Sequence, residues 1–275
     1  MGELFALVDP ACTGCGLCVQ DCLAHALELR DGVARVVPGR EGDCYRCLHC
    51  LAICPQGAVG FQELGAADCE PLAGPVLDPR ALETLVKARR SVRQYLDQDL
   101  DPALVRHLLE VAWHAPTGAN ARQVLFTVVA ERGRMDRLRS LVYAALGRLV
   151  RSGGLPQSRA RFAGFVRLWE EAGEDVLFRG APHLVVASVP AGVATPLPDC
   201  LIALTTFDLL AQAHGVGTLW DGLATTAFQT LVPEVREILG LPPSHQVGYV
   251  MVFGPPAVRY ARTVPRPGAL IRMLG

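Results

Sequence analysis

Eight of the ten cysteines in the chain fall into two runs that share one internal spacing. Each run reads C-x2-C-x2-C-x3-C, and the second lies 32 positions after the first. The register continues beyond the cysteines, because Ala26 and Leu27 align with Ala58 and Val59. Self-similarity at a fixed distance indicates an internal duplication. The runs are Cys12, Cys15, Cys18 and Cys22, followed by Cys44, Cys47, Cys50 and Cys54.

This spacing is typical of bacterial ferredoxins, in which three thiolates of a run hold one 4Fe–4S cluster and the fourth ligates the other cluster. Small residues in the first loop, Thr13, Gly14 and Gly16, allow three thiolates to converge. Residues 1–61 are therefore predicted to form a two-cluster ferredoxin domain, which by itself relays electrons and has no substrate. The first cluster is expected on Cys12, Cys15, Cys18 and Cys54, and the second on Cys44, Cys47, Cys50 and Cys22.

Zinc and disulfides are the alternatives for clustered cysteines. Structural zinc usually takes two pairs of ligands separated by a long gap, and these runs lack that layout. Disulfides are rare in a reducing cytoplasm. We interpret His49 as a loop residue, and Cys69 and Cys200 as ordinary buried or linker thiols.

The residue after each run differs between the two copies. Cys54 is followed by Pro55, as in the ferredoxin pattern, whereas Cys22 is followed by Leu23. The ligand is kept, but the local turn and the potential of the second cluster stay open.

Composition narrows the class of protein. The 275 residues are 51% hydrophobic and 19% charged, which is enough apolar material for a substantial core. A net charge of −1 gives no reason to expect a nucleic acid or an anionic membrane as partner. The opening "MGELFALVDPACTG" lacks the features of a signal peptide, and we expect no membrane span and a cytoplasmic location.

The rest of the chain predicts a second, larger domain. Residues 62–79 are rich in Gly, Ala, Pro and acids and are typical of a linker, and residues 80–275 alternate helical patterns with short β-rich runs. Asp78-Pro79 and Asp101-Pro102 predict two helix starts. Further helices are expected at 133–150, 157–173 and 199–214, and strands at 124–130, 183–189 and 246–253. An α+β or α/β layout around one sheet follows, without a Rossmann glycine motif or a P-loop.

Three short stretches favour a different phosphate-bearing cofactor. "RRSVRQY", residues 89–95, offers three guanidiniums and a hydroxyl, and arginine binds phosphate oxygens bidentately. "APTGAN", residues 115–120, is a polar turn with a glycine. "GVGTLWDGL", residues 215–223, has small residues that let backbone N–H groups approach a planar ligand. Taken singly, the three are more often a solvated helix end, a loop, and a turn beside a core tryptophan.

Taken together and in this order, the stretches make the chain resemble the FMN-dependent nitroreductase family, and more closely its branch with an amino-terminal two-cluster ferredoxin domain. The resemblance extends from residue 85 to the carboxyl end and also rests on "APHLVV", "HGVGTLWDG" and "VFGPPAVRYARTVPRP". It implies a nitroreductase-like FMN-binding α/β fold. That fold has a mixed central sheet flanked by helices, forms an intertwined homodimer, and here follows a small ferredoxin-like domain.

The resemblance also implies a set of cofactor-binding residues. The FMN phosphate and pyrimidine edge would be held by Arg89, Arg90, Ser91 and Arg93, with carboxyl-terminal contacts from Arg262 and Arg259. Backbone N–H groups of Asp221 and Gly222, after Trp220, would lie near the flavin N5 and O4. The partner subunit would supply Pro116, Thr117, Gly118 and Asn120.

Two departures from the family pattern concern the substrate-facing surface. Family members often have glutamine and proline shortly after the asparagine, where this chain has Ala121, Arg122 and Gln123. The usual Gly-Tyr-Pro near the end is Gly254-Pro255-Pro256 here.

The resemblance implies an oxidoreductase in which electrons pass from an external donor through two 4Fe–4S clusters to FMN and then to a nitroaromatic, a quinone or an activated alkene. Chemistry at the flavin N5 requires no catalytic side chain, so we interpret His114 and His214 as core or loop histidines. A ferredoxin-like or other low-potential donor is expected, and a nicotinamide stays open. The alternatives are a non-catalytic electron-transfer or redox-sensing module, and specialised cofactor-modifying or dehalogenating chemistry.

Overall fold

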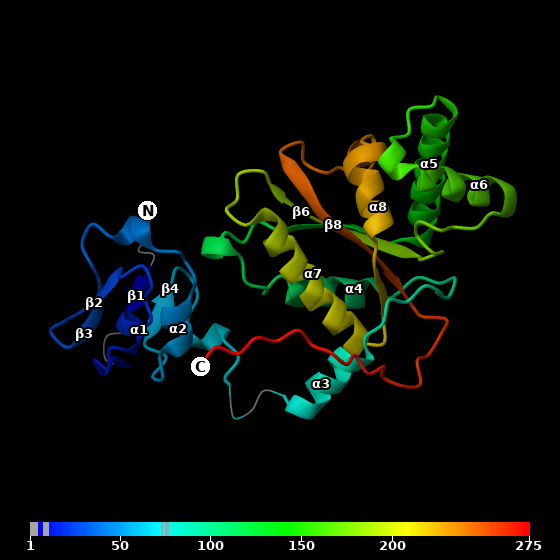
Figure 1. Cartoon of the computed structure of the whole chain (residues 1–275). Helices are drawn as coiled ribbons and strands as arrows, with labels where there is room; N and C mark the ends of the chain where they lie inside the picture. Colours follow the sequence, from blue (N-terminus) through cyan, green and yellow to red (C-terminus); the bar gives the residue numbers. More distant parts are fainter. Residues whose placement is uncertain (1–4, 8–10, 73, 75–76) are drawn as a thin grey trace. The chain divides into compact units, whose positions relative to one another are not determined.

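The computed structural model describes residues 5–7, 11–72, 74 and 77–275 (Figure 1). Residues 1–4 and 8–10 of the predicted ferredoxin domain and positions 73, 75 and 76 of the predicted linker lie outside these ranges. The chain divides into two compact units, residues 1–76 and 77–275. The finer boundaries predicted at 61/62 and 79/80 remain predictions.

Among its described residues, the first unit contains two small antiparallel sheets and two short helices. Strand β1 (Phe5–Leu7) pairs with β4 (Val59–Phe61), and β2 (Leu27–Arg30) pairs with β3 (Val33–Val36). Helix α1 (Leu17–Gln20) lies within the first cysteine run, and helix α2 (His49–Ile53) lies within the second. Short 3₁₀ turns lie at Glu41–Asp43 and Ala66–Asp68.

The duplication is visible in the backbone of this unit. Three pairs of residues, each 32 positions apart, adopt left-handed backbone angles in both copies. The pairs, with their φ values, are Gly14 (67°) with Arg46 (52°), Gly16 (74°) with Leu48 (63°), and His25 (49°) with Gly57 (61°). The same loop geometry is therefore built twice, although only one member of each pair is glycine, the residue that adopts it without a steric penalty.

The second unit is organised around a four-stranded sheet in the order β5-β6-β8-β7. The neighbouring strands are antiparallel, and an isolated parallel bridge joins Ser91 to Thr218. The strands are β5 (Leu125–Val129), β6 (His183–Pro190), β7 (Gly217–Trp220) and β8 (His245–Gly254). Three of them match the predicted strands. Strand β7 lies in the stretch that sequence reasoning interprets as a turn, and it forms by pairing with β8 along four residues.

Helices cover both faces of this sheet (Figure 1). Asp78 and Asp101 cap the first two, accepting hydrogen bonds from Arg80 N (3.0 Å) and Ala103 N (2.9 Å), with proline at the first helical position as predicted. The helices are α3 (Pro79–Ala88), α4 (Pro102–Ala112), α5 (Arg132–Arg151), α6 (Arg161–Ala172), α7 (Pro196–Ala213), α8 (Gly222–Thr226) and α9 (Val235–Ile238). A π-helical turn, Ala227–Leu231, continues α8, and 3₁₀ turns lie at Gly118–Asn120 and Gln157–Arg159.

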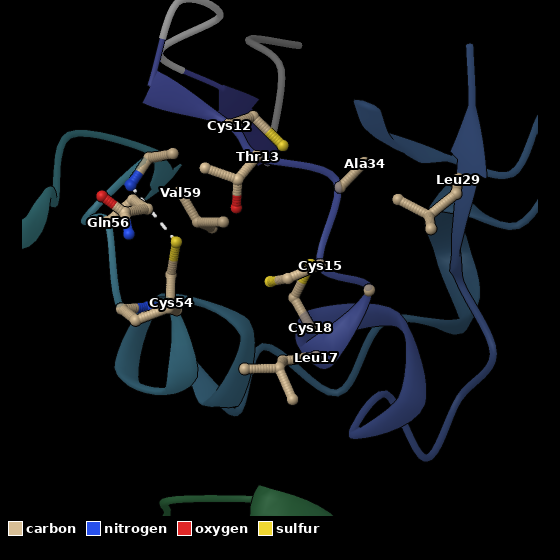
Figure 2. A pocket seen from close by; sticks show the side chains of 13 residues that line it. Cys12, Thr13, Cys15, Leu17, Cys18, Leu29, Ala34, Cys54, Gln56 and Val59 are labelled. Atoms are coloured by element: carbon tan, nitrogen blue, oxygen red, sulfur yellow. Dashed lines mark hydrogen bonds between the residues drawn. The ribbon is translucent and has the colours of Figure 1, made fainter. Parts of the chain in front are cut away.

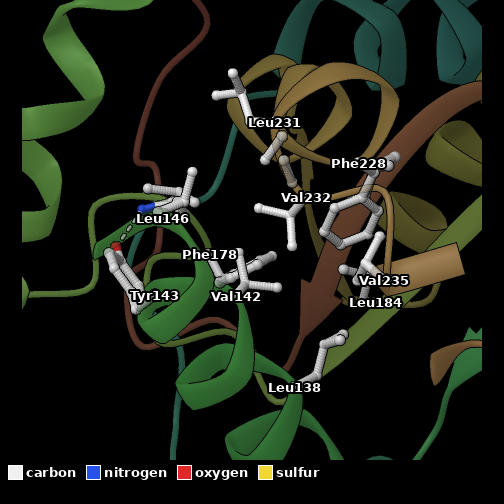
Figure 3. Packing of buried hydrophobic residues seen from close by; sticks show 14 of the residues in the cluster. Leu138, Val142, Tyr143, Leu146, Phe178, Leu184, Phe228, Leu231, Val232 and Val235 are labelled. Carbon is white, nitrogen blue, oxygen red and sulfur yellow. Dashed lines mark hydrogen bonds between the residues drawn. The ribbon is translucent and has the colours of Figure 1, made fainter. Parts of the chain in front are cut away.

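The sheet separates two hydrophobic cores. On one face, side chains of α5, α6 and α8 pack with Phe178 and Phe228 (Figure 3). On the other face, α4 and α7 pack against Phe253. Alternate residues of β6 face the two cores, so this strand is buried on both sides and reads as the continuous apolar run "HLVVASV". None of the helices in the described part of the chain is long and apolar enough to cross a membrane.

Candidate functional sites

Four cysteines from both runs line one pocket in the first unit (Figure 2). Three come from the first run, Cys12, Cys15 and Cys18, and the fourth is Cys54 of the second run. This grouping is the one predicted for two-cluster ferredoxins, in which the fourth cysteine of each run ligates the cluster of the other run. Burial, with the neighbouring cysteines as a smaller cause, raises the pKa of the Cys18 thiol.

The remaining cysteines are arranged around Cys50. Burial raises the pKa of its thiol to about 11, and the nearby Cys47 and Cys44 add to the shift. Cys22 and Cys50 both pack against one small apolar cluster, which also contains Cys18 of the first set.

The fourth cysteines of the two runs, Cys22 and Cys54, have matching surroundings. Cys22 Sγ accepts a hydrogen bond from the Ala26 N–H at 3.4 Å, and Cys54 Sγ accepts one from the Ala58 N–H at 3.3 Å. These contacts are related by the 32-residue repeat. In iron–sulfur proteins, hydrogen bonds to the sulfurs are among the features that set the reduction potential.

Zinc and a 4Fe–4S cluster require different geometries of the side chains that bind them. Among the described residues, no three His, Cys, Asp or Glu side chains lie close enough to hold one ion. Zinc needs all its ligands within about 2.0–2.3 Å of one centre, whereas a 4Fe–4S cluster spreads its thiolates over several irons. His49 instead lies 3.2 Å from the Asp21 carboxylate, Cys69 is exposed, and Cys200 is buried.

In the second unit, the arginine stretch 89–95 leaves the end of α3 and runs beside β7. Val92 N donates to Thr218 O at 2.8 Å, next to the bridge between Ser91 and Thr218. On its other side, Ala257 N donates to Gln94 O at 2.9 Å. The structure thus brings together three stretches that are far apart in the sequence, 89–95, 217–222 and 255–260.

The guanidinium groups in this stretch keep unused donors. Arg89 Nη1 and Arg90 Nη2 are buried and have no hydrogen-bond partner within the described ranges. Unmade hydrogen bonds of buried donors are costly, most of all for charged groups, so these atoms fit an anionic ligand. Arg93 Nη1 donates to Ser91 O at 3.4 Å, whereas Arg259 and Arg262 are exposed.

Asp221 and Gly222, which follow β7, differ in whether the backbone N–H group is used within the chain. Asp221 N donates to Val250 O at 3.0 Å, so this N–H extends the sheet pairing and is already used within the chain. Of the two N–H groups expected near a flavin ring, that of Gly222 remains, at the first residue of α8. Trp220 Nε1 donates to Asp208 Oδ2 at 2.9 Å.

The Asp221 side chain caps α8 with one oxygen. Its Oδ1 accepts from Ala224 N at 2.8 Å, while the buried Oδ2 has no partner among the described residues. Burial raises the pKa of this carboxyl to about 7. A buried carboxyl with a strongly raised pKa and an unused oxygen makes this end of β7 a candidate functional site.

The loop 115–120 is anchored at a different place. Gly118 N donates to Asp199 Oδ1 at 3.0 Å, and a Cβ on Gly118 would lie 2.0 Å from Thr195 Oγ1, so only glycine fits there. Ala119, Asn120 and Arg122 have positive φ values of 50°, 53° and 50°. Strained backbone of this kind persists where the surrounding structure holds it, often at ligand sites.

The loop 115–120 and the arginine stretch contact α7 at different points along its length. Asp199 holds the loop near the start of α7, and Asp208 contacts the arginine stretch nine residues later. At 1.5 Å per residue, these positions are about 13 Å apart along the helix axis. Within one chain the loop and the arginine stretch are therefore anchored at separate positions on α7.

Sequence reasoning missed the acids that organise these regions. Asp199 and Asp208 are 3% and 2% exposed. A signal was available, because both are acids within a helix whose other residues are almost all apolar or small. Acids are rarely buried in such a helix unless they are paired or hydrogen-bonded.

Comparison with known proteins agrees with this architecture. Residues 86–255, more than half of the chain, match the sequence model of the nitroreductase family. The chain belongs to the nitroreductase family. This nitroreductase is therefore an oxidoreductase enzyme, and its residues 11–59 match the model described as a 4Fe-4S dicluster domain.

Individual relatives are distant but cover most of the second unit. Nitroreductase NfnB from Mycolicibacterium smegmatis is 27% identical over 188 residues, which are 59% of this chain and 80% of that protein. The crystal structure of FMN-dependent NfnB in complex with NADPH has a TM-score of 0.51 and 26% identity, covering 69% of this chain and 95% of that one.

Two more distant structures share the fold. An FMN-bound nitroreductase from Bacteroides fragilis has a TM-score of 0.57 at 21% identity, covering 70% of this chain and 98% of that one. Iodotyrosine deiodinase bound to FMN and 3-iodo-L-tyrosine has a TM-score of 0.52 at 18% identity, covering 70% and 99%. The predicted nitroreductase-like fold of this nitroreductase is confirmed.

Proposed function

We propose that this nitroreductase is an iron–sulfur flavoprotein that reduces a small acceptor, namely a nitroaromatic, a quinone or an activated alkene. The proposed electron path runs from a ferredoxin-like or other low-potential donor through two 4Fe–4S clusters and FMN to that acceptor. The observation that carries the flavin assignment is the pair of buried guanidinium nitrogens on Arg89 and Arg90 that have no hydrogen-bond partner among the described residues. They lie on a stretch that is hydrogen-bonded to β7, in a fold shared with an FMN-bound and an FMN-dependent nitroreductase.

The residues proposed to hold FMN fit its chemistry. A phosphate dianion would take charge-assisted hydrogen bonds from Arg89, Arg90 and Arg93 and one from Ser91 Oγ. Gly222 N–H and the Trp220 side chain border the proposed ring site, and the exposed Arg259 and Arg262 can add charge. When bound, FMN supplies hydride transfer, so the chain needs no side-chain nucleophile.

The residues proposed to hold iron are the eight cysteines of the two runs. The shared pocket of Cys12, Cys15, Cys18 and Cys54 supports one ligand set, and the surroundings of Cys50 support the other. Clusters bound there would supply one-electron transfer. A reducing cytoplasm suits such thiolates, and we propose that location.

A homodimer is proposed because α7 is incompletely covered in one chain. This helix is apolar on nearly all sides, yet Leu197 and Ile202 are 50% and 41% exposed. Helices that are apolar all round are normally buried. A second copy packed over α7 could supply its Pro116, Thr117, Gly118 and Asn120 to the flavin site.

The test is an anaerobic reconstitution followed by turnover. The protein is loaded with iron, sulfide and FMN, and then reduced in parallel by NADH, NADPH and reduced ferredoxin while the flavin and cluster absorbance bands are recorded. We expect ferredoxin to reduce both chromophores, and a nitroaromatic or a quinone to reoxidise them over many turnovers. Reduction without turnover of any small acceptor would favour the alternative, a non-catalytic electron-transfer or redox-sensing module.

A further inference from the structure

Asp208 joins three parts of the candidate flavin site through one buried carboxylate. It lies on α7 and is 2% exposed. Its Oδ1 accepts a hydrogen bond from Thr218 Oγ1, and its Oδ2 accepts one from Trp220 Nε1 at 2.9 Å. Oδ2 also lies 3.5 Å from Arg89 Nη1. The carboxylate thus contacts both ends of β7 and the first residue of the arginine stretch.

The charge on Asp208 needs a partner because burying a carboxylate is costly. Within the described ranges, Arg89 is the cation that pairs with it, and the Arg89 side chain is 25% exposed. The contact does not have hydrogen-bond geometry, since Arg89 Nη1 is left without a hydrogen-bond partner. The ion pair therefore orients the guanidinium while leaving this donor for another acceptor.

The strand contacts make this orientation rigid. Thr218 is bonded through its side chain to Asp208 and through its carbonyl to Val92 N. Gln212 Nε2 donates to Thr218 Oγ1 at 3.3 Å, which adds a second contact from α7. Arg89 is thus set by Asp208 on one side and by the paired stretch 91–92 on the other.

We propose that Asp208 is a positioning residue that aims Arg89 at the phosphate of FMN, an inference that rests on the proposed flavin site. Asp208 has two opposing effects on FMN affinity. A carboxylate this close to a phosphate dianion repels it, so removing the charge alone would strengthen FMN binding. Removing the constraint on Arg89 would weaken FMN binding, and the measured direction separates the two effects.

The experiment titrates FMN and riboflavin into flavin-free protein, for wild type and for Asp208→Asn. Asparagine keeps the shape but loses the ion pair. We expect FMN affinity to fall about fivefold, a part of the effect of losing Arg89 altogether, and riboflavin affinity to stay within about twofold. An equal fall for both flavins would assign Asp208 to holding β7 alone and would overturn the proposal. Unchanged or stronger FMN binding would overturn it as well.

A double-mutant cycle shows whether Asp208 acts through Arg89. In the Arg89→Ala background, adding Asp208→Asn should no longer lower FMN affinity, because the residue that it positions is gone and only the repulsion of the phosphate is relieved. A full effect of Asp208→Asn in that background would contradict the proposal. If Asp208→Asn does not fold, Asp208→Glu keeps the charge and displaces it, and should also lower the ratio of FMN to riboflavin affinity.

Asp175→Asn is the matched control. Asp175 is likewise a buried carboxylate paired with an arginine, Arg139, but it belongs to the other core. Its loss should lower the melting temperature and leave the ratio of FMN to riboflavin affinity unchanged. Wild-type protein that binds the two flavins equally would refute the phosphate site itself. Discrimination by wild type that survives Asp208→Asn would refute only the role of Asp208.

Discussion

Arg89 ends α3 with a buried guanidinium nitrogen that is left without a hydrogen-bond partner in the described part of the chain. If this side chain binds the FMN phosphate, Arg89→Ala removes a charge-assisted hydrogen bond, and FMN affinity should fall about 10- to 150-fold. Riboflavin affinity and iron content should not change, because riboflavin lacks the phosphate and the cysteines belong to the other unit. Isothermal titration of both flavins into wild-type and variant apo-protein measures this. An unchanged FMN dissociation constant would show that Arg89 does not hold the phosphate and serves only as the partner of Asp208.

Asp221 predicts a pH dependence of stability. Its pKa is raised from 3.8 to about 7 in the folded state. Between these values the folded state keeps a proton that the unfolded state has lost, so the free energy of unfolding falls as pH rises. A shift of this size corresponds to a loss on the order of 4 kcal/mol between pH 4 and pH 7.

Asp221→Asn should remove most of this slope, since asparagine resembles the protonated acid and can still cap α8. Urea unfolding between pH 5 and pH 8 checks it, and the variant should be the more stable form at pH 8. Asp101→Asn, the same change at the exposed cap of α4, should keep the wild-type slope. A variant with the wild-type slope at position 221 would show that this carboxyl is ionised throughout.

At the scale of elements, the second cysteine loop copies the first with less suitable residues. Leu48 has φ of 63° where its counterpart Gly16 has 74°. A left-handed conformation costs a residue with a Cβ about 1–2 kcal/mol, and the extra freedom of unfolded glycine offsets part of this. Leu48→Gly should therefore be more stable than Leu48→Ala by about 0.5–1 kcal/mol, although both lose the same leucine packing.

Anaerobic denaturant titration followed at the cluster absorbance bands measures that difference. Gly16→Ala is the mirror change and should destabilise by a similar amount, because a Cβ there would meet only an ordinary contact, 3.4 Å from Leu29 Cδ1. Equal stability of the Leu48→Gly and Leu48→Ala proteins would mean that bound clusters override the backbone preference.

The exposed face of α7 is the element that a second copy should cover. Ile202→Asp places a charge on it, and we expect a monomer that loses FMN, because the loop 115–120 of the partner would no longer reach the site. Ile238→Asp on α9 is the matched control, since Ile238 is 43% exposed and lies outside α7. Sedimentation velocity and flavin content report both outcomes. A dimeric, FMN-loaded Ile202→Asp protein would exclude this face.

At the scale of the whole molecule, the two units should lose their cofactors independently. The two cysteine sets predict about eight irons per chain. Cys44→Ala should remove about four of them while FMN stays bound, because the proposed flavin residues all lie in the second unit. Iron, sulfide and flavin analysis of anaerobic protein checks this. Parallel loss of flavin would show that the two units depend on each other.

Local patterns in the sequence were enough to predict several elements of the fold. Cysteine spacing predicted the duplicated loops, because ligands three residues apart converge through the local backbone alone. Asp-Pro pairs predicted the starts of α3 and α4, since capping involves only neighbouring residues. The buried strand β6 was recognisable because both of its faces are apolar.

Contacts between distant segments decided the rest. Strand β7 is four residues long and exists by pairing with β8, which no local propensity reveals. The hydrogen bond from the Asp221 N–H to the Val250 carbonyl depends on the same pairing of β7 with β8. The burial of Asp208 beside Arg89 joins residues 119 positions apart, and only packing of α7 against the sheet brings them together. Sequence reasoning could therefore name the arginines, while the tertiary structure showed which of their donors stay unused and which acid holds them.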